Sequence, residues 1–215
     1  YLTADGVALP AVPQSAATAV HVALDSVYQG TVLLRDAPKP DARRAISALK
    51  ELGIRKTVML SGDSQAVAAE IGREIGLDQA VGQLLPEDKL ERLEQLRSHL
   101  SRKGKLLYTG DGINDTPVLA AADIGIAMGG LGADAAIEIA DVIIMGDEPS
   151  KIADGIRIAR RTSRIAMENI VFSIAVKVLI LLLSVLGRVE LWAAVFADVG
   201  VCMICVLNTL RINQK

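Results

Sequence analysis

Two aspartates and an asparagine follow a short apolar run near the middle of the chain, at Asp111, Asn114 and Asp115. The run itself, residues 105–108, is typical of a buried strand. The glycines that separate it from the acidic residues favour a sharp turn, and Pro117 suits the first turn of a following helix. Carboxylate and amide oxygens at the end of a strand are suited to Mg²⁺ and to a phosphoryl group that Mg²⁺ bridges. The pattern therefore predicts a magnesium and phosphoryl site, with a purely structural polar turn as the alternative.

Two further segments carry groups suited to phosphate. Ser61-Gly62-Asp63 follows an apolar run at 56–60, and a hydroxyl with exposed backbone amides at a helix start can bind phosphate oxygens. By itself this triplet is more typical of a capping turn. Lys89 lies in the first turn of a helix that begins near Pro86, where a cation opposes the helix dipole. Such a lysine is expected to reach an anion, with a solvated surface lysine as the alternative.

Short apolar runs alternate with helical patterns from about residue 30 onward. Strands are predicted at 31–35, 56–60, 105–108, 123–128 and 141–145, and helices at 41–52, 65–74, 86–99 and 133–140. This alternation is typical of an α/β fold in which helices flank a parallel sheet. Because the carboxyl ends of parallel strands meet at one edge, Ser61 and Asp111 are expected to share a crevice.

Composition limits the class of partner. Of the 215 residues 51% are apolar and 3% aromatic, and the net charge is only −2 at pH 7. Weak charge and scarce aromatic residues give no reason to expect a nucleic-acid partner. Both cysteines lie in the apolar stretch after Asn169, so no disulfide framework is predicted. A reducing cytoplasm is expected around the α/β part.

Two apolar segments, at about 169–187 and 190–210, predict a transmembrane hairpin. Each approaches the roughly 20 residues needed to cross a bilayer. A basic connecting helix over 151–168 precedes the first segment, and Arg211 and Lys215 follow near the end of the second. These positive charges place both ends of the hairpin in the cytoplasm. The lipid bilayer is the expected partner, and a pair of buried helices in a soluble protein is the alternative.

One ionisable residue lies inside each apolar segment. Lys177 and Asp198 are each separated from the intervening turn by roughly 12–15 Å of helix, at about 1.5 Å per residue. An ionisable group in a membrane span usually has a partner and a function. We predict a Lys177–Asp198 pair near the midplane, in which Asp198 binds a transported cation and Lys177 is its counter-charge; a purely structural salt bridge is the alternative. Cys202 and Cys205 could add soft ligands, although buried cysteines often act as small apolar residues.

The segment from Gly110 to Pro117 resembles the hinge motif of P-type ATPases, whose phosphorylation domain belongs to the haloacid dehalogenase-like superfamily. The resemblance extends through 61–63, 86–89 and the membrane segments. It implies a Rossmann-type sheet in an incomplete phosphorylation domain at 30–150, preceded at 1–29 by the tail of a nucleotide-binding domain. The family's Asp-Lys-Thr-Gly-Thr segment, which carries the phosphorylated aspartate, is absent. We therefore expect a C-terminal part of a longer protein that is inactive alone.

The resemblance also implies roles for the site residues and cofactors. ATP is the substrate, and Asp111 binds Mg²⁺ with Asp115 beside it. Lys89 and Ser61 contact the phosphoryl oxygens, and Asp63 helps to close the nucleotide domain onto the site. The implied catalytic residues are Lys89, Ser61, Gly62, Asp63, Asn114 and Asp115.

The membrane segments narrow the resemblance to one subgroup. A lysine in the first span and Asp198-Val199-Gly200 in the second resemble the zinc-, cadmium- and lead-exporting heavy-metal ATPases. The Tyr-Asn and Met/Ser patterns of copper exporters are not found, and the subgroup's Cys-Pro-Cys motif would lie upstream. The implied function is ATP-driven export of Zn²⁺, Cd²⁺ or Pb²⁺ across the plasma membrane. Copper or potassium pumping, a membrane-anchored phosphatase and a non-catalytic membrane subunit are the alternatives.

Overall fold

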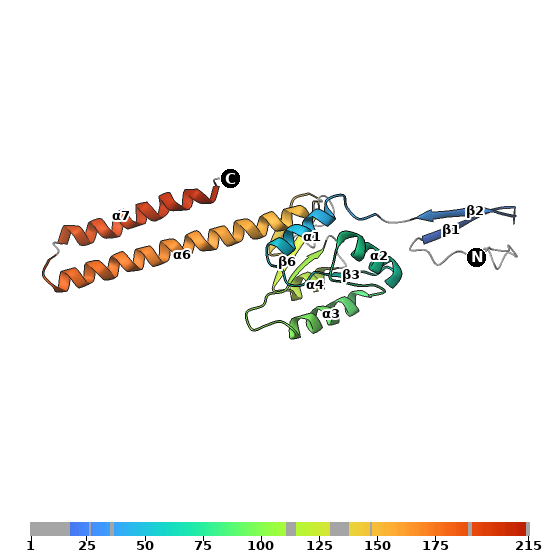
Figure 1. The fold of residues 1–215 in the computed structure, drawn as a ribbon, viewed down its shortest axis with the longest axis horizontal. Coiled ribbons are helices and arrows are strands. Elements are labelled where there is room, and N and C mark those ends of the chain that lie inside the picture. The colour runs from blue at the N-terminus through green and yellow to red at the C-terminus, as the bar shows by residue number, and fades with distance from the viewer. Residues whose placement is uncertain are drawn as a thin grey trace. The chain divides into compact units, whose positions relative to one another are not determined.

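The computed structural model describes residues 18–25, 27–34, 37–110, 115–129, 138–146, 148–188 and 191–213 (Figure 1). The chain divides into two compact units, one over residues 1–152 and one over 153–215. The first unit contains the strands and short helices, and the second contains most of one long helix and all of another. The domain ranges expected from the sequence stay predictions.

The first two strands form a hairpin of their own. β1 (Thr18–Leu24) pairs with β2 (Val27–Leu34) in an antiparallel two-stranded sheet, and Asp25 in the turn has a positive φ of 48°. A strand was expected at 31–35, but as part of the parallel sheet. That expectation is wrong in its pairing, because β2 hydrogen-bonds to β1 rather than to the later strands.

The remaining strands are parallel, as the sequence predicts. β3 (Val58–Leu60) pairs with β4 (Gln79–Val81), and β5 (Leu107–Gly110), β6 (Ile124–Met128) and β7 (Val142–Ile144) form a separate sheet in that order. The short strand β4 was not predicted, since three residues give too little alternation to detect. The fold class expected from the sequence, a parallel α/β arrangement, is confirmed.

Four helices of this unit lie close to the predicted positions. They are α1 (Ala42–Glu51), α2 (Gln65–Ile75), α3 (Pro86–Ser98) and α4 (Thr116–Ala121). α1 packs against α2 and α3 against α4, while α4 also covers β5 and β6. Leu119 and Ala127, each 1% exposed, form the centre of the core beneath Tyr108. Of the predicted helix at 133–140, only its last residues lie within the described part of the chain.

One hydrogen-bond pattern recurs where the parallel strands begin. An aspartate that precedes one strand accepts the backbone N–H of a residue near the start of the neighbouring strand. The aspartate's own N–H donates to the carbonyl of that same residue. The three pairs are Asp78 with Thr57, Asp123 with Leu106 and Asp141 with Gly125, at N···Oδ2 distances of 2.7, 2.9 and 2.8 Å. These aspartates fix the register at the amino ends of the strands, opposite the edge where chemistry is expected.

The second unit is an antiparallel pair of helices. α6 (Ser150–Val185) is one continuous helix of 36 residues, and it includes both the basic stretch and the first apolar segment. α7 (Leu191–Thr209) returns beside it and ends in a short 3-10 turn, Leu210–Asn213 (Figure 1). Both are long and apolar enough to cross a bilayer. In the expected turn, Gly187 has a positive φ of 68°, and residues 189–190 lie outside the described residues.

Candidate functional site

Lys89 and Asp115 form the centre of the candidate phosphoryl site. Lys89 Nζ lies 2.8 Å from Asp115 Oδ1, and the two side chains are only 17% and 15% exposed. Lys89 belongs to the first turn of α3, and Asp115 directly precedes α4. The sequence predicted that this lysine reaches an anionic phosphoryl group, and in the structure its partner is the Asp115 carboxylate. Its role toward phosphate stays a prediction.

Local sequence explains why Lys89 is held there. Pro86 begins α3, where its missing N–H costs nothing. Asp88 Oδ2 accepts the Leu85 N–H at 2.9 Å, which is one half of a capping box. Acidic residues in this turn complement the helix dipole, and Asp115 neutralises the one basic side chain among them.

The carboxyl end of β5 is shaped around Asp115. A Cβ on Gly110 would lie 3.0 Å from both Cβ and Oδ2 of Asp115, so only glycine fits without movement. Just before it, the Thr109 hydroxyl is buried and has no hydrogen-bond partner in the described part of the structure. Asp111 and Asn114, predicted to bind Mg²⁺ and order the loop, lie outside the described residues.

The Ser61 loop is the second predicted phosphate contact. Ser61 Oγ donates to Asp63 Oδ2 at 2.7 Å and accepts the Asp63 N–H at 3.1 Å. Ser64 then caps α2 by accepting the Val67 N–H. The triplet is therefore an ordered turn with exposed polar groups, and both the phosphate and the capping functions are compatible with it.

This loop is bound to the segment that leads into α3. Ser61 N–H donates to Val81 C=O at 2.9 Å, and the Leu84 N–H returns to Ser61 C=O at 3.1 Å. The Gln65 side chain bridges the same strand, donating to Ala80 C=O and accepting the Gly82 N–H. These bonds connect the Ser61 turn to the segment that leads into the helix carrying Lys89.

Sequence reasoning missed the residues that make this junction. A Cβ on Gly82 would lie 2.7 Å from Asp63 C=O and 2.8 Å from the Gln65 backbone. Next to it Gln83 has a positive φ of 59°, and its N–H donates to Asp63 C=O at 2.6 Å. A glycine shortly before Leu-Leu-Pro was the available signal, but nothing local indicates a contact with residues about twenty positions earlier.

The structure also brings together the charged residues of the two apolar helices. Lys177 Nζ on α6 lies 2.8 Å from Asp198 Oδ1 on α7. This confirms the pairing, which was predicted because both residues lie at a similar helical distance from the turn between the helices. Their side chains are 58% and 70% exposed within this chain. The role of the pair in transport stays a prediction.

The two cysteines behave differently from each other. Both are free thiols, with Cys202 exposed and Cys205 partly buried. Cys205 Sγ lies 3.8 Å from the Asn169 carbonyl, and Asn169 Nδ2 donates to the Cys205 carbonyl at 3.1 Å. Among the described residues no group of three or more His, Cys, Asp or Glu side chains is placed to hold a metal ion. Cys205 is thus part of a helix contact, and metal binding by either cysteine stays a prediction.

An asparagine that the sequence did not single out is central to that helix contact. Besides Cys205, Asn169 Nδ2 contacts Thr209 Oγ1 at 3.2 Å, and Asn169 Oδ1 accepts from Asn208 Nδ2 at 2.8 Å. We call Asn169, Cys205, Asn208 and Thr209 the asparagine clasp. It holds α6 and α7 together two turns from Lys177.

Comparison with known proteins now identifies the class. The sequence model of the haloacid dehalogenase-like hydrolases matches residues 7–123. The chain belongs to this family, as the parallel strands and the acidic site at the end of β5 indicate.

Individual relatives narrow the assignment. The chain is 49% identical over 201 residues to the cadmium, zinc and cobalt-transporting ATPase of Bacillus subtilis, and 53% identical over 199 residues to a zinc-transporting ATPase of Synechocystis. The matches cover 94% and 93% of this chain but only 29% and 28% of those proteins. The chain therefore spans less than a third of the length of these relatives.

A solved structure gives the same result. The chain superposes on a zinc-transporting PIB-type ATPase in an E2·Pi state with a TM-score of 0.80 at 38% identity, over 92% of this chain and 32% of that one. Together with the sequence relatives, it confirms the predicted resemblance to heavy-metal P-type ATPases. With two helices apolar enough to span a bilayer, the matches indicate a membrane protein.

Proposed function

We propose that this chain forms part of an ATP-driven exporter of divalent soft metals such as Zn²⁺ and Cd²⁺. The observation that carries the proposal is the Lys177–Asp198 ion pair, at 2.8 Å, within two apolar helices joined to a haloacid dehalogenase-like unit. A membrane-anchored phosphatase would need the acidic site but would not need a charged pair inside a span. The metal-transporting relatives support the same choice.

In this proposal the Lys89 ammonium neutralises the phosphoryl group while it transfers. Before transfer, the ammonium lies 2.8 Å from the Asp115 carboxylate. Both side chains are mostly buried, and electrostatic effects are strong in such a site. The Ser61 hydroxyl and the backbone of its turn bind further phosphoryl oxygens. Asp63 acts at the exposed rim of this site, where it meets the nucleotide-binding part.

The donor set at the end of β5 fits Mg²⁺. Asp115 offers carboxylate oxygens beside a glycine that leaves room, and the buried Thr109 hydroxyl, which has no partner among the described residues, could bond to a further polar group. Asp111 and Asp115 are the residues we propose to hold the ion. When bound, Mg²⁺ would neutralise charge on the phosphoryl oxygens.

The nucleophile is proposed to come from polypeptide outside these 215 residues. β3 is paired on one side with β4, and β5 on one side with β6, so each has an edge without a described partner strand. A parallel strand along either edge would present its carboxyl end near the Ser61 turn or Asp115. An aspartate there would attack the γ-phosphate of ATP and release ADP, and water would then hydrolyse the resulting aspartyl phosphate to free phosphate.

The membrane site is proposed to need further helices. An unpaired charge in a bilayer costs at least about 2.5–3.5 kcal/mol, and here both members of the pair are more than half exposed within this chain. Other spans of the full protein would cover them. Asp198 would then bind the divalent cation, and Lys177 would displace it on release.

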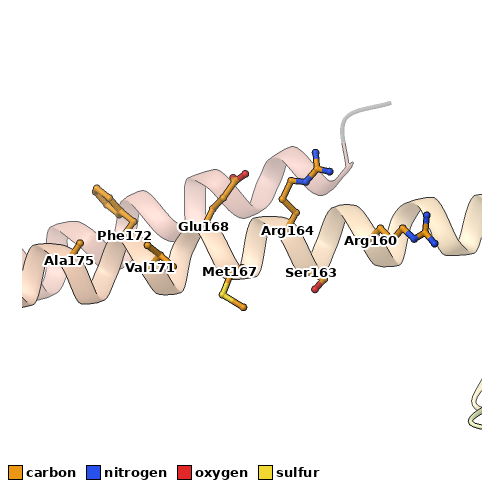
Figure 2. Close-up of a pocket in the computed structure, with 8 residues that line it drawn as sticks. All are labelled: Arg160, Ser163, Arg164, Met167, Glu168, Val171, Phe172 and Ala175. Atoms are coloured by element: carbon orange, nitrogen blue, oxygen red, sulfur yellow. The ribbon is translucent and has the colours of Figure 1, made fainter. Parts of the chain in front are cut away.

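The surface of α6 supports a cytoplasmic position for the first unit. An open groove along this helix is lined at one end by Arg160 and Arg164 and at the other by Val171, Phe172 and Ala175 (Figure 2). A change from basic to apolar side chains over about four turns is typical of a membrane boundary with its positive end inside the cell. We propose the plasma membrane as the location.

The test is metal-stimulated ATP hydrolysis by the full-length protein in lipid vesicles, compared across Zn²⁺, Cd²⁺, Pb²⁺ and Cu⁺. We expect stimulation by the three divalent ions and its loss in Asp198→Asn, with Asp154→Asn as the control for an exposed carboxylate. Stimulation by Cu⁺ alone would assign a copper exporter. Metal-independent hydrolysis that Asp198→Asn leaves unchanged would favour the membrane-anchored phosphatase.

A further inference from the structure

Asp41 directly precedes α1, yet its carboxylate does not cap that helix. No side-chain capping bond forms at the start of α1. Instead, Asp41 Oδ2 accepts the backbone N–H of Ser150 at 2.9 Å, from a residue 109 positions later in the chain. Ser150 is the first residue of α6. A carboxylate of the α/β unit therefore caps the long helix that continues into the apolar hairpin.

The physical chemistry of this contact favours a firm attachment. The first N–H groups of a helix have no partner within it, and they carry the positive end of its dipole. A carboxylate that accepts one of them forms a charge-assisted bond. The bond lowers the pKa of Asp41, chiefly through the Ser150 N–H, so the group is ionised at neutral pH.

The other end of α1 is also fixed. Lys50, in its last turn, lies 2.8 Å from Asp78 Oδ1, and Asp78 in turn binds Thr57 at the start of β3. α1 is thus attached by a side chain at each end, to the parallel strands through Lys50 and to α6 through Asp41. The helix therefore connects the parallel strands to the first turn of α6.

We propose that Asp41 is a positioning residue that couples the phosphoryl site to the membrane helices. It holds the first turn of α6, and the same uninterrupted helix carries Lys177 of the ion pair. Movement of the α/β unit during phosphoryl transfer would reach the pair through this attachment. The inference rests on the proposed function, and it names the residue through which the two sites communicate.

The test compares Asp41→Ala with Asp41→Asn in the full-length protein. The alanine variant loses the acceptor, whereas the asparagine amide oxygen still accepts the Ser150 N–H without the charge. Because Asp41 does not cap α1 with its side chain, neither change removes a bond from that helix. Ser64→Ala, which removes the cap of α2, is the control for a loss of capping elsewhere in the unit.

The first readout is hydrogen exchange of peptides that cover residues 148–153. We expect about tenfold faster exchange in Asp41→Ala, a smaller increase in Asp41→Asn and no change in Ser64→Ala. Unchanged exchange in Asp41→Ala would overturn the attachment itself. This readout requires no transport activity, so it separates failure of the inference from failure of the proposed function.

The second readout separates coupling from catalysis. Metal-independent hydrolysis of p-nitrophenyl phosphate reports the cytosolic site, and Zn²⁺-stimulated ATP hydrolysis reports communication with the membrane. We expect Asp41→Ala to change p-nitrophenyl phosphate hydrolysis by no more than about twofold and to lower Zn²⁺-stimulated ATP hydrolysis by about fivefold or more. Asp41→Asn should recover part of the Zn²⁺-stimulated activity. An equal fall in both activities, or no fall in either, would overturn the coupling role.

Discussion

The Lys89 ammonium and the Asp115 carboxylate lie 2.8 Å apart, although 26 residues separate them in the chain. The contact joins the first turn of α3 to the residue that precedes α4, at the edge of the unit where β5 ends. Each side chain is less than one-fifth exposed. The ion pair holds the Lys89 side chain toward the end of β5, where the phosphoryl group is proposed to bind.

Replacing Lys89 tests the phosphoryl role. We expect Lys89→Ala to lower phosphoenzyme formation from ATP by roughly 10²–10³-fold, the range typical of losing one positioned donor. Radiolabel incorporation by the full-length protein measures it. Lys103→Ala, which removes an exposed lysine, should leave incorporation unchanged. A Lys89→Ala protein that labels normally would restrict Lys89 to a structural ion pair.

A charge exchange tests the membrane pair. Asp198→Lys alone should place two cations together and reduce the amount of folded protein in the membrane. Adding Lys177→Asp restores opposite charges, so we expect protein level and thermal stability to recover. Zn²⁺-stimulated ATP hydrolysis should stay lost, because the carboxylate now lies on α6. Recovery of that activity as well would identify the pair as a structural salt bridge.

Asp78 gives a prediction for stability against pH. Hydrogen bonds from Lys50 and Thr57 lower its pKa from 3.8 to about 2. Because the folded pKa is depressed, the stabilisation is present above pH 3.8 and is lost as pH falls through about 2. We expect Asp78→Ala to reduce the unfolding free energy by about 1–2 kcal/mol at neutral pH, a modest figure because the side chain is partly exposed.

Thermal unfolding of wild type and Asp78→Ala at a series of pH values measures this effect. The difference in stability should narrow only as the pH falls below about 4 and should approach zero near pH 2. Glu148→Ala, at an exposed ion pair with Lys151, is the control and should differ little from wild type. A pH-independent deficit in Asp78→Ala would mean that packing, rather than the carboxylate charge, is responsible.

Gly82 provides a packing prediction. A methyl group there would overlap backbone atoms of Asp63 and Gln65, so we expect Gly82→Ala to cost about 1–3 kcal/mol and to loosen the Ser61 turn. The unfolding temperature and the amount of phosphoenzyme formed should both fall. Gly155→Ala has open space around the added atom and should show neither effect. If Gly82→Ala matched the wild type in unfolding temperature and phosphoenzyme formation, the Ser61 turn and the Gly82 segment would not need to stay in close contact.

The asparagine clasp can be tested by Asn169→Leu. The change removes bonds to Cys205, Asn208 and Thr209, each worth about 0.6 kcal/mol and at most about 1.7 kcal/mol within a membrane. We expect a loss of about 1–3 kcal/mol in the resistance of the full protein to denaturation in mixed micelles. Ser173→Ala, one turn further along α6, is the control. Equal stability of the two variants would contradict a role for the clasp in joining the helices.

Local sequence was sufficient for most elements but not for their pairing. Helix starts at Pro86 and Ser64 follow from capping rules, and apolar composition indicates the membrane-spanning parts of α6 and α7. The strand at 31–35 was expected in the parallel sheet, yet β2 pairs with β1. Periodicity indicates that a run is a strand but does not specify its neighbour, because pairing depends on residues distant in the chain.

The candidate site divides in the same way. Amino-acid type and spacing identified Lys89, Asp115, Lys177 and Asp198, because a charge that is misplaced on a helix or buried in an apolar segment needs a partner. Gly82, Asn169 and Asp41 were not identified, since glycine, asparagine and aspartate have ordinary local uses in turns and caps. Their contacts here join segments that are distant in the chain.

By itself the sequence determined the α/β class, the two apolar helices and which polar and charged groups are candidates for phosphoryl transfer and cation binding. Only the tertiary structure decided which groups meet: Lys89 with Asp115, the Ser61 turn with Gly82, and Asp41 with the first turn of α6. The physical reason is that side-chain chemistry and helix or strand periodicity are local properties. A hydrogen bond or ion pair between distant segments depends on how the whole chain packs.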